Sequence, residues 1–202
     1  MLKRRNLFIG FKSAKAIPVR EPLVRDLLIQ TTLNPDVSAI DYQANVFSDD
    51  RVVAVDGILV DRCDGSYAVD IVDARPAADQ AAVALMQVAL QRNCRGIIET
   101  SAADIRAEPR LSSAREVWGH RAMHVHPDDR AQIVGTLESE GPLELVRFDE
   151  LVDTQRDTRA VIYSLACEGT VELDLRAGLG ARAMVRAGRF AYSAPLRVAY
   201  GA

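Results

Sequence analysis

The chain has 202 residues, enough for one compact domain or for one domain with a small appendage. Its 49% apolar and 26% charged residues are the proportions of a folded globular protein, which excludes a fibrous repeat and a mostly disordered chain. The longest uncharged stretch, Gln80 to Gln91, is far shorter than the roughly 20 residues that a bilayer requires. The N-terminus shows no signal peptide, so we expect a cytoplasmic protein without a membrane partner.

The first hundred residues predict a helix, three strands, a second helix and a fourth strand. Leu23 with Leu27 and Val24 with Leu28 form the rows of an amphipathic helix that ends before Pro35. Strands follow in YQANVF, RVVAVDGILVDR and SYAVDIVDARP, with a hairpin turn centred on Asp64-Gly65. A helix over 81–92 and a short strand IIET, apolar enough to be central in the sheet, complete this half.

The second half is predicted to be a helical extension. Residues 101–141 are expected to form helical pieces and loops, followed by a short helix near 148–152 and another that Asp157 or Thr158 caps. The alternating VELDL and the segment ARAMVR then form a two-stranded ribbon. Two helices and a ribbon are typical of a winged-helix-like end, although a plain α+β extension of the core explains the same pattern. We therefore predict an α/β protein with a core at 17–100, an extension at 101–202 and a basic arm at 1–16.

Charge is distributed unevenly along the chain. The net charge of −3 is the sum of +6 over residues 1–20, +5 over residues 176–202 and −14 over the residues between them. Both basic ends are candidates for contacts with phosphate groups. The alternative interpretation is that both ends are solvated tails. The candidate DNA-binding residues are Lys3, Arg4, Arg5, Lys12, Lys15, Arg182 and Arg186.

Two aspartates of the predicted hairpin are candidates for metal chemistry. With the turn centred on Asp64-Gly65, Asp56 and Asp73 fall almost opposite each other on adjacent strands. Paired carboxylates can hold a divalent ion that polarises a phosphate and generates hydroxide.

The order αβββαβ, together with these acids, resembles the PD-(D/E)XK nucleases. More narrowly, EPLVRDLL, YQANV, VDGILV, DGSY and VDARP resemble the N-terminal domain of TnsA-type transposon-end endonucleases over roughly residues 17–100, and loosely to about 186. The resemblance implies a restriction-endonuclease-like fold that acts on duplex DNA with Mg²⁺ or Mn²⁺. It also implies a protein partner, such as a transposase or another subunit of a complex.

The resemblance assigns four catalytic positions. Asp56 stands at the metal-binding aspartate, Asp73 at the second carboxylate, Arg75 at the lysine and Glu21 at the glutamate of the first helix. Arg75 departs from the family, because arginine cannot give up a proton and orients water differently from an ammonium group. No lysine follows Lys15 that could replace it. Three interpretations therefore stay open: an endonuclease with an altered site, a catalytically inactive DNA-binding or assembly module of a transposition or defence complex, and an unrelated fold in which both aspartates are solvated.

Other signals are weaker. His120, His124 and His126 could chelate zinc, but a surface or boundary cluster is the favoured interpretation. Gly178 and Gly180 imitate a dinucleotide fingerprint, yet too little chain follows for the βαβ unit. Cys63, Cys94 and Cys167 are widely spaced and expected to be reduced, and Trp118 is expected in the core.

Overall fold

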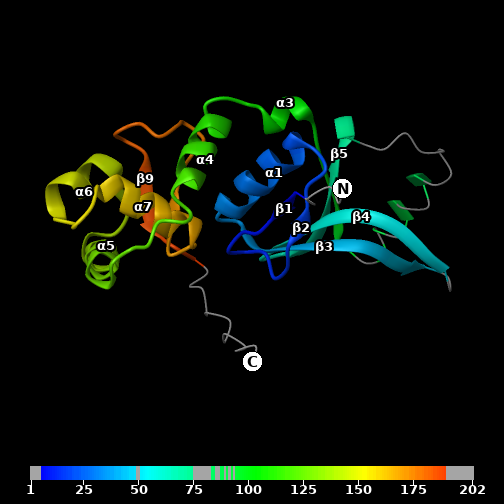
Figure 1. Ribbon diagram of the computed structural model, residues 1–202, viewed down its shortest axis with the longest axis horizontal. Coiled ribbons are helices and arrows are strands. Elements are labelled where there is room, and N and C mark those ends of the chain that lie inside the picture. The colour runs from blue at the N-terminus through cyan, green and yellow to red at the C-terminus, as the bar shows by residue number, and fades with distance from the viewer. Residues whose placement is uncertain are drawn as a thin grey trace, which may run out of the picture.

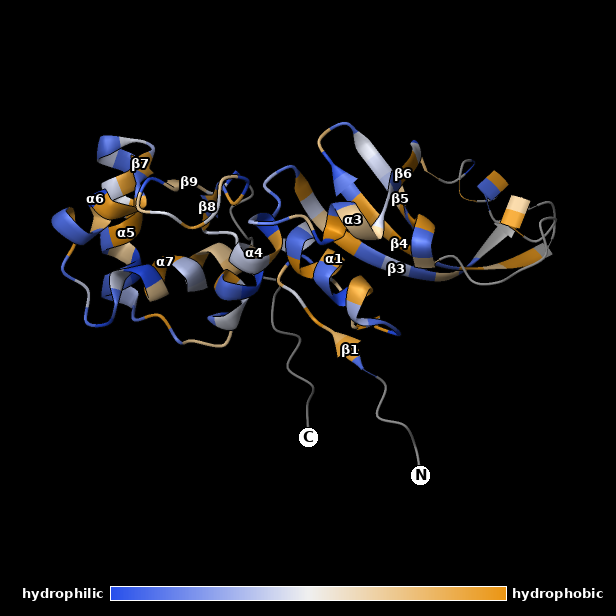
Figure 2. Ribbon diagram, turned by 90° about the horizontal axis from the view of Figure 1, so that it is seen from above, coloured by the Kyte–Doolittle hydropathy of each residue, from blue (hydrophilic) through white to orange (hydrophobic). Residues whose placement is uncertain are grey.

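A computed structural model describes residues 6–48, 51–74, 83, 84, 87, 88, 90, 92 and 94–189. It is a mixed α/β structure in two parts, which lie side by side in Figures 1 and 2 with helix α4 between them. We call them the sheet lobe, built from α1 and β3 to β6, and the helical lobe, built from α5 to α7 and β7 to β9. Within the described part of the chain, every helix is too short or too polar to cross a bilayer.

The sheet lobe contains a four-stranded sheet with the strand order β3-β4-β5-β6. Helix α1 (Pro22–Leu33) begins with proline in its first turn, where the missing N–H costs nothing, and it packs on one face of the sheet. Val53, Val55, Ala68 and Leu90 form a small core on the other face. The remaining elements of this lobe are β3 (Val37–Ser48), β4 (Arg51–Arg62), β5 (Gly65–Ile71) and β6 (Gly96–Thr100).

The hairpin between β4 and β5 differs from the prediction by one residue. Arg62 pairs with Gly65, so the turn is made by Cys63 and Asp64, and Gly65 supplies the positive φ of +137° that a residue with a side chain rarely adopts. A turn moved by one residue changes the cross-strand register by two. Continuing the observed register places Asp56 opposite Ile71, not opposite Asp73.

Strand β6 closes the sheet as an edge strand. It runs parallel to β5, and its hydrogen-bonded neighbour in the described sheet is β5 alone, so the prediction of a central position is wrong. Within the predicted helix at 81–92, the described residues 83, 84, 87, 88, 90 and 92 are helical, as predicted. The element order is therefore helix, three antiparallel strands, helical residues and a parallel strand.

The helical lobe has a small three-stranded sheet in the order β7-β9-β8. The side chain of Asp157 accepts hydrogen bonds from the Arg159 and Ala160 N–H groups, which confirms the predicted cap of α7. The elements after β6 are α3 (Ala102–Ile105), α4 (Arg110–Gly119), α5 (Pro127–Glu140), β7 (Leu143–Glu144), α6 (Leu145–Leu151), α7 (Thr158–Cys167), β8 (Val171–Leu173) and β9 (Met184–Ala187).

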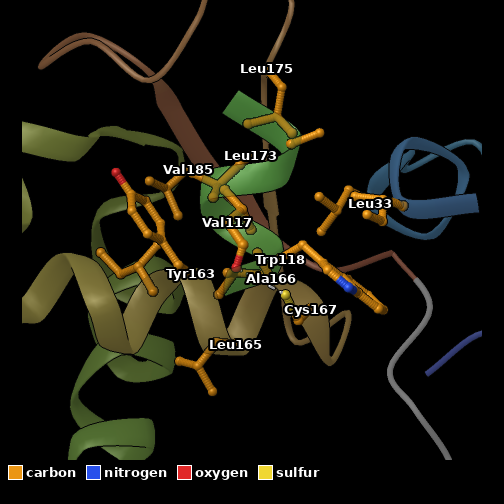
Figure 3. Close-up of a cluster of buried hydrophobic side chains, with 14 of the residues drawn as sticks. Leu33, Val117, Trp118, Tyr163, Leu165, Ala166, Cys167, Leu173, Leu175 and Val185 are labelled. Atoms are coloured by element: carbon orange, nitrogen blue, oxygen red, sulfur yellow. Dashed lines mark hydrogen bonds between the residues drawn. The ribbon is translucent and has the colours of Figure 1, made fainter. Parts of the chain in front are cut away.

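One hydrophobic core runs through both lobes. It includes Leu28 and Ile40 of the sheet lobe, Val117 of α4, and Leu165 and Val185 of the helical lobe. Figure 3 shows the part of this core around α4 and α7, with Leu33 of α1 facing it. Asp26 of α1 and Arg115 of α4 add an ion pair with two hydrogen bonds, 2.7 and 2.9 Å long, at the edge of the core.

The described part of the predicted basic arm belongs to the folded body. Strands β1 (Leu7–Phe8) and β2 (Ile17–Pro18) pair with each other, and Phe8 and Ile17 are buried. Phe8 stacks on Trp118 with 5.1 Å between the ring centroids, which confirms that Trp118 is a core residue. Residue 16 is therefore no boundary between an arm and a core.

Candidate functional site

Asp56 lies at a β-bulge near the start of α1. Gln43 pairs with Gly57 and Asn45 with Ala54, so two residues of β4, Val55 and Asp56, lie opposite one residue of β3. Asp56 has a φ of +45°, a left-handed conformation that aspartate tolerates better than most residues. Strained backbone of this kind clusters at functional sites, so Asp56 stays the leading candidate for a functional residue.

The carboxylate of Asp56 is held by two side chains that the sequence did not point to. Arg20, in the segment before α1, places Nη1 2.6 Å from Asp56 Oδ2, and the hydroxyl of Tyr42 donates to Oδ1. Arg20 directly precedes the family-like segment that begins at Glu21, and Tyr42 is the first residue of the family-like segment YQANV. The signal that could have found Tyr42 is strand alternation, because it is the register partner of Ile58, two residues beyond Asp56 on β4.

Glu21 occupies the N-cap position of α1 without a side-chain capping bond. It is exposed, and the contact between the start of α1 and Asp56 is made by Arg20.

The sequence predicted Asp73 on the third strand, and this prediction is wrong. Strand β5 ends at Ile71, and Val72–Ala74 form a 3-10 turn that carries Asp73 out of the ladder. Its carboxylate accepts a hydrogen bond of 2.5 Å from the Ala102 N–H at the start of α3. This N–H is one of those that a helix leaves without an internal partner, so Asp73 stabilises the start of α3. Arg75 lies outside the described residues.

These positions do not fit a divalent ion shared by Asp56 and Asp73. The oxygens of Asp56 face Arg20 and Tyr42, an oxygen of Asp73 faces a backbone N–H, and the register separates the two residues. Over the ranges that the structure describes, no three His, Cys, Asp or Glu side chains come together as metal ligands. The acids that the sheet does bring into register are Asp70 and Glu99, on β5 and β6.

The three histidines lie on separate elements. His120 follows α4 and packs edge-on against Tyr163, with 5.4 Å between the centroids, whereas His126 caps α5 by accepting the Asp128 N–H. His124 lies in the loop between them. They do not share one helical face.

The candidate DNA-binding residues have different environments. Lys12 donates to the Asn34 main-chain oxygen at 2.7 Å, and burial lowers its pKa to about 8 against the opposing effects of Glu172 and Asp36. Lys12 thus ties the N-terminal segment to the end of α1. Lys15 pairs with Asp41 at 3.0 Å, and Arg182 and Arg186 are exposed. Lys3, Arg4 and Arg5 lie outside the described residues.

Comparison with known proteins does not assign the chain to a family. No family model matches the chain, and no curated protein matches it.

Proposed function

We propose that this protein acts on DNA as a non-cleaving binding or assembly module built on a nuclease-like scaffold. The scaffold is supported by the element order of the sheet lobe: α1, the antiparallel strands β3, β4 and β5, helical residues, and the parallel strand β6. This is the αβββαβ order on which the resemblance to PD-(D/E)XK nucleases rests. The bulge at Asp56 lies on β4, where that chemistry would have its first carboxylate.

The observation that carries the non-cleaving part of the proposal is the state of the two aspartates. Hydrolysis by this family's chemistry needs carboxylate oxygens that converge on one ion. Here Arg20 neutralises Asp56, and Asp73 is engaged by α3. The same two contacts give each carboxylate a structural role, which an inactive relative would retain.

The helical lobe supports a way of binding DNA that does not read bases. Its order helix, strand, helix, helix, strand, strand, with β9 between β7 and β8, is similar to a winged helix. In such a domain the third helix enters the major groove. The corresponding helix, α7, has every residue from Val161 to Cys167 buried, so only the side chains of its first turn, Thr158 to Ala160, are partly accessible to base edges. Basic residues would then contact phosphates, in the manner of sequence-independent binding.

Fluorescence anisotropy with a labelled duplex tests the proposal. We expect equal affinity in EDTA and in Mg²⁺, and a steep fall in affinity as salt rises. Replacing Lys3, Arg4 and Arg5 together with glutamine should weaken binding to all duplexes, and the slope of log K against log salt should fall by about one for each phosphate that these side chains neutralise. The matched control is Arg156→Gln, an exposed arginine of the loop before α7, which should change little.

A plasmid nicking assay separates this proposal from its main competitor. With Mn²⁺ and supercoiled plasmid, we expect wild type and Asp56→Ala to nick equally little. Nicking by wild type that Asp56→Ala abolishes would establish a metal-dependent endonuclease and overturn the non-cleaving module. Absence of salt-sensitive duplex binding would overturn the role on DNA.

A further inference from the structure

A cavity of about 440 Å³ opens between the sheet lobe and the helical lobe. Its walls come from α1, from strands β4 to β6, from the start of α4 and from β8, β9 and the segment that joins them. Asp56, in the middle of β4, is not among the lining residues, and the cavity lies against Val60 and Arg62 at the C-terminal end of that strand. Clefts of this size between two parts of a protein are where small ligands usually bind.

Part of the cavity lining is apolar. Val60, Val69 and Ile98 contribute side chains from three neighbouring strands, and Leu33, Leu173 and Leu175 face them from α1 and the helical lobe. Figure 3 shows Leu33 on α1 across from Leu173 and Leu175. Protein interiors are close-packed, and side chains around an empty space lose their dispersion contacts on one side. An apolar ligand body in this space would restore those contacts and remove the lining from water.

Positive charge exceeds negative charge among the residues that line the cavity. Five arginines and three carboxylates contribute to the lining: Arg62, Arg110, Arg176, Arg186, Arg189, Asp36, Glu172 and Asp174. The carboxylates already have partners. Asp36 lies 3.2 Å from Arg189 and 3.9 Å from Arg62, Glu172 lies 3.6 Å from Arg189, and Asp174 lies 3.1 Å from Arg176.

Two arginines form no ion pair with a described carboxylate, although their positive charges act at longer range, Arg110 on Asp104 and Arg186 on Asp174. The side chain of Arg110 donates to a neutral acceptor, the main-chain oxygen of Asp104, at 2.5 Å. Arg186 on β9 is exposed and takes part in no ion pair with a described residue. Guanidinium groups bind carboxylate, sulfonate and phosphate oxygens through charge-assisted hydrogen bonds.

We propose that this cavity binds a small amphipathic organic anion, with its apolar body between the two lobes and its acidic group at Arg110 and Arg186. The site needs neither Asp56 nor the basic N-terminus, and Arg186 is the one residue that it shares with the candidate DNA-binding residues named above.

A pair of fluorescent probes tests this assignment on the full chain. The first, 8-anilinonaphthalene-1-sulfonate, has an aromatic body and an anionic group, and the second, N-phenyl-1-naphthylamine, is its uncharged counterpart. We expect saturable binding of one sulfonate probe per chain. The double variant Arg110→Gln/Arg186→Gln should weaken binding of the sulfonate about tenfold or more and leave the affinity for the neutral probe unchanged. Arg156→Gln, which removes an exposed arginine elsewhere, should leave both affinities unchanged.

A cavity-filling variant locates the binding. Thr31 lines the cavity from α1, and its hydroxyl bonds only to the Leu27 carbonyl one turn earlier, so Thr31→Phe fills space without breaking a tertiary hydrogen bond. With a wild-type circular dichroism spectrum, this variant should bind neither probe. Unchanged affinity for the sulfonate in the double arginine variant, or unchanged affinity for both probes in a folded Thr31→Phe protein, would overturn the proposal.

Discussion

At the scale of single residues, Asp56 combines an unusual backbone conformation with an ion pair and a hydrogen bond of its carboxylate. Asp56 has a positive φ at the bulge, and its carboxylate lies within reach of Arg20 and Tyr42. The ion pair is largely exposed, with 74% of the Arg20 side chain accessible to solvent, so it contributes little to stability. The backbone conformation is therefore the larger energetic effect at this position.

This comparison predicts the order of two substitutions. Asp56→Ala and Asp56→Gly both remove the ion pair, but only glycine adopts the left-handed conformation without steric cost. Asp56→Ala should therefore have a free energy of unfolding about 1 kcal/mol lower than that of Asp56→Gly, measured by urea denaturation. An alanine variant as stable as the glycine variant would show that the bulge relaxes.

Lys12 is a second residue whose environment has a measurable consequence, because burial changes the pKa of its side chain. Burial lowers its pKa in the folded protein to about 8, from 10.5 for an unperturbed lysine. Between these two values the unfolded chain holds a proton that the folded chain has released. The stability should consequently rise as the pH increases through this window and gain nothing more from Lys12 above it.

Urea denaturation at pH 7.5 and at pH 9.5 checks this pH dependence. The wild-type free energy of unfolding should increase between the two values by more than that of Lys12→Met, which has no titrating group at this position. An equal change in both proteins would contradict the lowered pKa.

At the scale of elements, most helices and strands could be predicted from the sequence, but their relations could not. The apolar spacing of Leu23, Leu27 and Leu28 and the capping side chain of Asp157 are local signals, and both led to helices that the structure contains. The hairpin was found from Asp64-Gly65, yet its turn begins one residue earlier, at Cys63. A turn that begins one residue earlier is possible with the same turn residues, but it changes which residues of β4 and β5 lie opposite each other. Because of this change in register, Asp73 does not lie opposite Asp56.

The N-terminal segment carries a prediction of its own, because Phe8 of β1 and Ile9, which follows the strand, have opposite environments. Phe8 is 2% exposed and stacks on Trp118, whereas Ile9 is 68% exposed. Phe8→Ala should lower the free energy of unfolding by about 3–5 kcal/mol, and Ile9→Ala should change it by less than about 0.5 kcal/mol. Urea denaturation measures both. Similar decreases in the two variants would mean that the N-terminal segment does not pack on α4.

At the scale of the whole molecule, the two lobes share one core, which no local pattern in the sequence indicated. Helix α4 contacts α1 on one side and α7 on the other, and Trp118 lies in this central layer. Burial of α7 follows from the same packing, and so does the cavity beside α4. The expected boundary near residue 100 is therefore a change in secondary structure and not a break in the core.

A shared core predicts cooperative unfolding of the full chain. Thermal denaturation should show one transition, with the same midpoint by far-UV circular dichroism and by the fluorescence of Trp118, the only tryptophan. Two separate midpoints would show that the lobes unfold independently.

What the sequence determined by itself is local: the alternation of strands, the helical spacing, the caps, the turn regions and the charge of each segment. These depend on residues a few positions apart, which interact in the same way in any fold. Only the tertiary structure decided which side chains meet, including Arg20 with Asp56, Asp73 with the start of α3, and Phe8 with Trp118. Such contacts depend on register and on packing between distant segments, where a shift of one residue changes every partner.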